Sequence, residues 1–202
     1  MREGRPGALV GRVRGSGVGA RERLCDDGPV IPVLDTPRLR LRPLGLDDLE
    51  ALHAIQSDPE HMRYYPHPFS REESRAWIER TQERYARDGI GLLAVDDRET
   101  GEFLGNVGPC VQVVDGEAEV ELGWSVTPAR ARQGIATEAA AACRDWVFAS
   151  GRAGHVISLV RPENVPSAGV AEHLGMTVWK DVMWGTEPPM LHHVYRLDRL
   201  DA

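Results

Sequence analysis

Two arginines and a glycine stand directly before an Ala-rich run in "TPARARQGIATEAAAACRDW", residues 127–146. We expect a strand to end at Val126 and a helix to begin between Ile135 and Thr137, after a short loop. The backbone N–H groups of such a loop and of the first helical turn have no partners within the helix. Together with the helix dipole they form a site for an anion such as a phosphate.

The loop residues themselves suit a phosphate. Gly134 and Ala136 allow close approach to the backbone, and Arg130 and Arg132 supply charge for a pyrophosphate or a third phosphate. Neither GxxxxGK[ST] nor GxGxxG occurs, which excludes a Walker loop and a dinucleotide fingerprint and disfavours a phosphate-ligand enzyme of another fold. For the loop alone, a capped helix with solvated arginines is the alternative.

Hydrophobic periodicity predicts the elements around this loop. Strands are expected over 38–44, 91–95, 102–113, 117–126, 155–160, 176–184 and 191–197, and helices over 46–55, 70–89, from about 135, and 167–175. The helix at 70–89 begins with a capping box of Ser70 and Glu73 and ends at Gly89. The resulting order of strands and helices predicts one α/β domain on a single mixed sheet, over residues 33–202.

Composition narrows the function classes for this chain of 202 residues. The net charge of −7 argues against a dedicated nucleic-acid binder, and no apolar run approaches the roughly 20 residues of a membrane span. Cys25, Cys110 and Cys143 form no CxxC pair, so we expect free thiols and a cytoplasmic protein. The histidines have no ligand spacing, so no metal is expected. Residues 1–32, rich in Gly and Arg, are predicted to be a flexible tail.

Four pieces of the sequence, in order, resemble the GNAT superfamily of N-acetyltransferases and its RimJ/RimL-like branch, which acetylates protein N-termini. They are "LDTPRLRLRPLGLDDLEAL", "SREESRAWIER", "EVELGWSVTPARARQGIATEA" and "NVPSAGVAEHLGM". The resemblance covers roughly residues 33–200. It implies a GNAT-like α/β fold, with one mixed, mostly antiparallel sheet that is flanked by helices and has splayed central strands.

The same resemblance implies acetyl-CoA as the co-substrate. The loop residues implied to bind it are Arg130, Ala131, Arg132, Gln133, Gly134, Ile135, Ala136 and Thr137. Val126 is implied to offer backbone groups to the pantetheine arm, between its own strand and the strand at 155–160, and Asn164 is implied to contact the cofactor. One departure is Ala131, where the family has Gln or Arg, and this weakens the expected side-chain contacts more than the backbone contacts.

Direct attack of an amine on the acetyl thioester is the implied chemistry. Glu121 is the expected base, acting through water, and its alternatives are a solvated strand residue or a histidine as the base. Ser167 is the expected proton donor to the leaving thiolate, and its alternative is a plain helix N-cap. Ala171 stands where many members have a tyrosine acid, so we do not expect a tyrosine acid here.

The acceptor is expected to be a peptide or protein N-terminus, near Tyr64, Tyr65 and Phe69. An α-amine with a pKa near 8 costs only about 1.4 kcal/mol to deprotonate at pH 7, whereas a lysine costs roughly 4.6 kcal/mol. One glutamate is therefore a more adequate base for an α-amine than for a lysine. A small amine (aminoglycoside, polyamine or amino acid) and a non-catalytic acyl-CoA-binding module remain alternatives, and the protein is expected to be a monomer or a homodimer.

Overall fold

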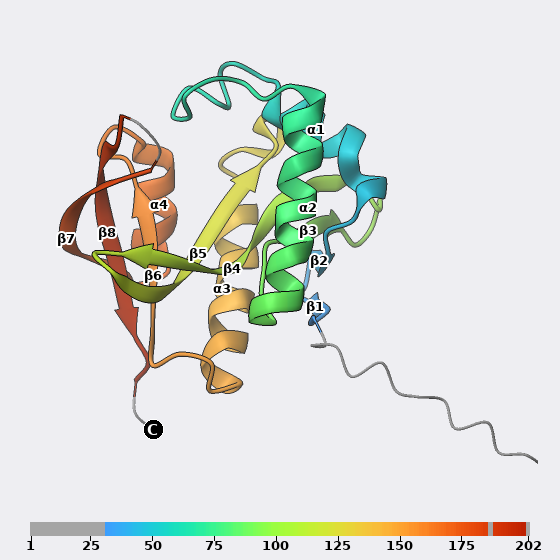
Figure 1. The fold of residues 1–202 in the computed structure, drawn as a ribbon. Coiled ribbons are helices and arrows are strands. Elements are labelled where there is room, and N and C mark those ends of the chain that lie inside the picture. Colours follow the sequence, from blue (N-terminus) through green and yellow to red (C-terminus); the bar gives the residue numbers. More distant parts are fainter. Residues whose placement is uncertain (1–30, 186–187, 201–202) are drawn as a thin grey trace, which may run out of the picture.

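A computed structural model describes residues 31–185 and 188–200 of the chain (Figure 1). The predicted tail at 1–32 lies outside these ranges except for its last two residues. Eight strands form one sheet: β1 (Leu34–Asp35), β2 (Leu39–Pro43), β3 (Leu93–Asp97), β4 (Phe103–Val114), β5 (Glu117–Val126), β6 (His155–Val160), β7 (Thr177–Trp184) and β8 (Met190–Asp198). Their spatial order is β1-β2-β3-β4-β5-β6-β8-β7.

Four α-helices and two short 3₁₀ helices complete the described part of the chain. The α-helices are α1 (Leu49–Gln56), α2 (Arg71–Asp88), α3 (Ile135–Ala149) and α4 (Val165–His173), and the 3₁₀ helices are η1 (Leu46–Asp48) and η2 (Pro128–Arg130). Within the described ranges, no helix combines the length and the hydropathy needed to span a bilayer.

The sheet is antiparallel at every pairing except the one between β5 and β6. These two strands run parallel and pair at a single position, Glu121 with Ile157. By contrast, β5 pairs with β4 along its whole length, from Glu117 to Val126. The central strands therefore diverge, which confirms the predicted mixed, mostly antiparallel sheet with splayed central strands.

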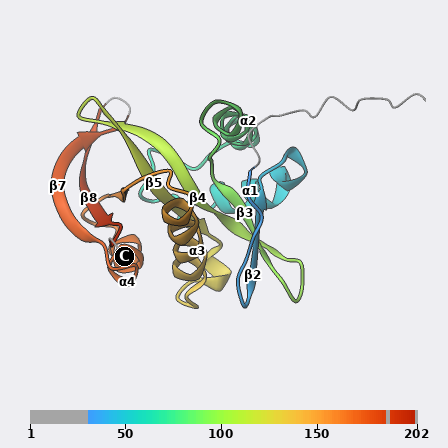
Figure 2. The same cartoon turned by 90° about the horizontal axis from the view of Figure 1, so that it is seen from below.

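Helices cover both faces of the sheet. Figure 2 shows α2 and α3 on opposite sides of it, and α3 packs against β4 and β5. The main core lies under α3, where Ala139, Ala140 and Cys143 are fully buried against strand residues such as Leu122. A second cluster joins α1 and α2 to Leu44 and Ala94. Each helix is thus held by one apolar face.

Most predicted elements are confirmed. The strand at 117–126 has the predicted bounds, and α2 begins after the predicted Ser70–Glu73 capping box and ends at Gly89, which has a φ of 67°. The single helix predicted over 46–55 was wrong at its start: Leu46 lies in η1 and is exposed, and α1 begins at Leu49.

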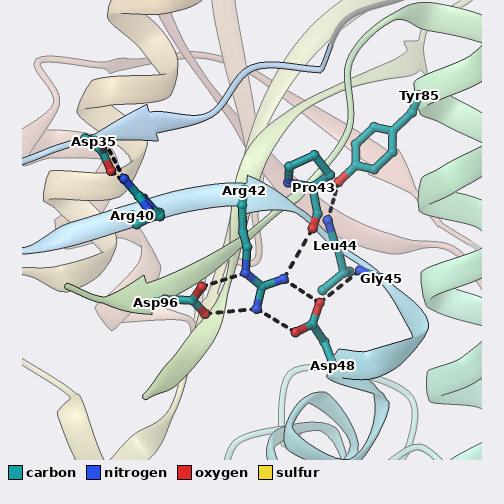
Figure 3. A network of polar contacts seen from close by, with 9 residues as sticks. All are labelled: Asp35, Arg40, Arg42, Pro43, Leu44, Gly45, Asp48, Tyr85 and Asp96. Carbon is teal, nitrogen blue, oxygen red and sulfur yellow. Dashed lines mark hydrogen bonds and ion pairs between the residues drawn. The ribbon is translucent and has the colours of Figure 1, made fainter. Parts of the chain in front are cut away.

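A partly buried polar network links the start of the domain to the sheet (Figure 3). Arg42 donates to both carboxylate oxygens of Asp48, at 2.9 and 2.7 Å, and its Nε donates to Asp96 at 2.6 Å. The Tyr85 hydroxyl accepts the Leu44 N–H at 3.0 Å and donates to the Leu92 carbonyl. Tyr85 thereby fixes the segment that leads into β3.

Candidate active site

A cavity of about 380 Å³ lies where β5 and β6 diverge. Its walls come from α2, α4, the strands β4 to β8 and the segment that precedes α2. Among the residues predicted to form the site, the cavity brings together Tyr64, Tyr65, Glu121, Asn164 and Ser167. Residues proposed for the acceptor, the base and the thiol side therefore share one space.

Glu121 occupies the point at which the two central strands part. Its Oε2 accepts a hydrogen bond from Gln112 Nε2 at 2.8 Å and lies 3.6 Å from the thiol of Cys110. Its Oε1 accepts from the amide of Leu159 at 3.4 Å. Burial raises the pKa of Glu121, and the hydrogen bonds from Gln112 and Leu159 offset only part of that rise. A carboxylate with a raised pKa is a better proton acceptor than an ordinary glutamate.

Asn164, not Ser167, caps helix α4. The Asn164 side chain accepts the Ser167 amide at 3.2 Å, so the alternative that Ser167 is itself the N-cap is wrong. Ser167 lies in the first turn and lines the cavity. Ala171, at the position of the tyrosine found in many relatives, is fully buried in the main core.

The loop between β5 and α3 presents a run of free amides. Within the described residues, no hydrogen bond uses a backbone N–H of residues 132–137 as its donor. Gly134 is the N-cap of α3 with a φ of 77°, and no side chain caps this helix start. Arg132 also has a positive φ, of 59°. Consecutive free N–H groups at a helix N-terminus form an anion site, and the glycine keeps a Cβ out of it.

Arg38, about 100 residues earlier in the chain, and Glu138, in the first turn of α3, brace this loop. Arg38 Nη1 donates to the carbonyl of Gln133 at 2.9 Å, and its Nε donates to Glu138 at 2.6 Å. Glu138 also accepts from the Thr36 hydroxyl at 2.6 Å. Although burial pushes the pKa of Glu138 upward, the hydrogen bonds from Thr36 and Arg38 hold it below its usual value.

Several predicted residues do not line the cavity. The loop residues lie outside it, and Arg130 forms an ion pair with Glu102. Val126 pairs with Gly105 and packs against the main core. Phe69 packs against Tyr65 and Trp77, at centroid distances of 6.1 and 5.9 Å, behind the cavity wall.

Other cavity residues were not predicted from the sequence. Trp77, Arg80 and Arg84 line the cavity from α2, and Asn106 lines it from β4. The three α2 residues are spaced i, i+3 and i+7, which places them on one helix face. That spacing could have indicated a shared polar face in the sequence. It was missed because the apolar residues of α2 account for the packing of the helix without the arginines.

Two histidines border the site. His192 lines the cavity, and its Nδ1 contacts the Met190 carbonyl at 2.9 Å, so in the neutral ring Nδ1 carries the proton and Nε2 is free to accept one. His61 Nε2 lies 2.9 Å from the hydroxyl of Ser125, and burial lowers the pKa of His61. Across the described ranges, no three His, Cys, Asp or Glu side chains are grouped to hold a metal ion.

Sequence comparison relates this arrangement to known proteins. The family model described as the acetyltransferase (GNAT) domain matches residues 38–177. The uncharacterized protein YkkB of Bacillus subtilis (strain 168) is 32% identical over 156 residues, which cover 77% of this chain and 91% of YkkB.

Solved structures give the same relationship. An acetyltransferase from Agrobacterium tumefaciens str. C58 matches with a TM-score of 0.72 at 32% identity, covering 84% of this chain and 96% of that one. RimL, a ribosomal L7/L12 α-N-protein acetyltransferase solved in complex with coenzyme A, matches with a TM-score of 0.64 at 17% identity, covering 83% and 97%. The second likeness concerns the fold alone.

Proposed function

Because the chain belongs to the GNAT acetyltransferase family, we propose that it transfers an acetyl group from acetyl-CoA to the α-amine at the N-terminus of a protein or peptide. The chain is an acetyl-CoA-dependent N-acetyltransferase, and the acceptor is the proposed part. One observation carries the assignment: the free amides at the start of α3 lie on the loop that follows β5, and β5 diverges from β6 around a cavity.

The residues present fit acetyl-CoA. The amides of residues 132–137 offer donors for the diphosphate, and Gly134 leaves room for it. The strand edge beyond the single β5–β6 pair offers backbone groups to the pantetheine arm, including those near Val126. Arg130 is engaged by Glu102, so the proposal assigns the diphosphate chiefly to backbone donors. Such contacts do not depend on the side chain at residue 131.

Acetyl-CoA supplies a thioester whose carbonyl carbon bonds to the amine nitrogen as the carbon–sulfur bond breaks. Glu121 is the proposed acceptor of the amine proton, through a water molecule. Two observations support this role: Glu121 lines the cavity where β5 and β6 diverge, and its pKa is raised. Ser167 is the proposed donor of a proton to the departing thiolate, and Asn164 holds the helix turn that carries it.

Three lines of support favour an N-terminal α-amine. An α-amine with a pKa near 8 costs less free energy for one carboxylate to deprotonate than a lysine does. The segment with Tyr64 and Tyr65 borders the cavity and offers aromatic surface to the first residues of a peptide. RimL, which shares the fold, is named as an α-N-protein acetyltransferase. A small amine remains the second candidate because the cavity is compact enough to enclose one.

The test is release of the CoA thiol from acetyl-CoA across peptides with free N-termini, aminoglycosides and polyamines, with mass spectrometry of each product. We expect a peptide N-terminus to gain one acetyl group at its α-amine. The same peptides with blocked N-termini serve as controls. If only small amines are acetylated, the acceptor is a small amine and not a peptide. If acetyl-CoA binds tightly but no product is acetylated, the protein is a non-catalytic binding module.

A further inference from the structure

One face of α2 lines the cavity with polar side chains. They belong to Trp77, Arg80, Arg84 and Thr81, and the Thr81 hydroxyl donates to the Trp77 carbonyl. Glu121 is the one acidic side chain among the cavity residues in the described ranges. No aspartate and no second glutamate there faces α2 across the cavity. The cavity therefore combines one carboxylate with guanidinium groups on its α2 wall.

Arg84 differs from the other half-buried arginines. Within the described ranges, no ion pair forms with Arg84, although its charge acts on Glu121 and lowers the pKa of that carboxyl against the effect of burial. Each of the other half-buried arginines there has a carboxylate partner; they are Arg42, Arg130, Arg144, Arg161 and Arg196. A half-buried guanidinium that faces a cavity without a partner is suited to an anion from outside the chain.

Two other residues of the cavity wall hold buried polar atoms without partners among the described residues. Asn106 is 1% exposed, and neither its Oδ1 nor its Nδ2 has a hydrogen-bond partner among the described residues. The indole Nε1 of Trp77 is also buried and unpartnered. Both residues line the cavity. Because buried polar groups in folded proteins are nearly always satisfied, these atoms indicate the place of a polar ligand.

We propose that the acceptor carries a carboxylate in addition to its primary amine. Arg84 binds that carboxylate, Trp77 and Asn106 donate to it, and the amine lies toward Glu121. Two sources share this chemistry: an acidic side chain at the second residue of a peptide, and the carboxylate of a free amino acid. This inference rests on the proposed function and specifies its acceptor.

The experiment compares matched acceptors by kcat/KM, expressed per unprotonated amine. One arm uses the tetrapeptide amides Ser-Glu-Ala-Ala and Ser-Gln-Ala-Ala, and the other uses alanine and alaninamide. In at least one arm we expect the carboxylate member to exceed its amide by about tenfold or more. Arg84→Gln should bring that ratio near one, whereas any change that it causes through the pKa of Glu121 should affect both members of a pair equally, and Arg84→Lys should retain part of the ratio.

Arg75→Gln is the matched control, because Arg75 lies on α2, is exposed and pairs with Glu79 outside the cavity. It should leave the ratio unchanged. Ratios near one in both arms of the wild-type enzyme would overturn the inference while acetyl transfer stands. An equal loss for both members in Arg84→Gln would also overturn it. Failure to acetylate any amine would remove the proposed function, and this inference with it.

Discussion

At the scale of single residues, Glu121 both connects the two strands next to it and lines the cavity. Its carboxylate accepts hydrogen bonds from Gln112 on β4 and Leu159 on β6, so it bridges the strands where they part. The same carboxylate lines the cavity and has a pKa raised by burial. A structural role and the proposed catalytic role thus fall on one side chain, and the two are distinguished by their dependence on pH.

Glu121→Gln should lower kcat/KM by about 10²- to 10³-fold, the range for loss of a general base. In the wild-type enzyme, activity should fall as pH drops through a value above the ordinary glutamate pKa of about 4.3, because only the ionised carboxylate accepts a proton. The variant should lack this acidic limb. The measurement is the pH–rate profile of both proteins, with kcat/KM expressed per unprotonated amine so that protonation of the acceptor adds no acidic limb of its own.

Glu119→Gln is the control for that profile. Glu119 points to the same face of β5 but binds His155 at 2.6 Å and does not line the cavity, so its profile should match the wild type. If the acidic limb persists in Glu121→Gln, another group is the base, and His192 is the first candidate to test.

At the scale of elements, the start of α3 is held in place by residues about 100 positions away. Arg38 and Thr36 both bind Glu138, and Arg38 also binds the Gln133 carbonyl. These contacts fix the loop while leaving its amides free. The proposed anion site is therefore preorganised, which reduces the conformational entropy lost on binding.

Gly134→Ala should raise the KM for acetyl-CoA several-fold with a smaller change in kcat. A Cβ at this position meets no backbone and lies 3.5 Å from Arg38 Nη2, but the φ of 77° strains it by about 1 kcal/mol. Gly151→Ala introduces a similar strain at a φ of 68°, in open space after α3. The KM of this control should stay unchanged, and an equal rise in both variants would assign the effect to general destabilisation.

Glu138→Gln should reduce the free energy of unfolding by about 1–2 kcal/mol near neutral pH, because it removes charge-assisted hydrogen bonds. The folded-state pKa of Glu138 is lowered, so its contribution is fully present above the unfolded-state pKa and disappears as pH falls through the folded-state value. Urea unfolding at several pH values checks this. A stability difference that persists below both pKa values would assign the loss to packing instead of charge.

At the scale of the whole molecule, local patterns predicted the elements but not the contacts that build the site. The strand over residues 117–126 and the capping box at Ser70 follow from neighbouring residues, and both are confirmed. The splay of β5 and β6 was expected only from the family resemblance. Arg84 and Asn106 went unnoticed because a polar residue that faces a cavity has the same local pattern as one that faces water. The Arg38–Glu138 brace depends on topology, which no local period encodes.

The binding of acetyl-CoA at the free amides of residues 132–137 is most directly tested by hydrogen–deuterium exchange of the whole protein. Coenzyme A should slow amide exchange in peptides that cover this loop. Pantetheine, which lacks the diphosphate, should leave exchange there unchanged. Unaltered exchange across residues 132–137 in the presence of saturating coenzyme A, with protection elsewhere, would contradict the placement of the diphosphate and the site built around it.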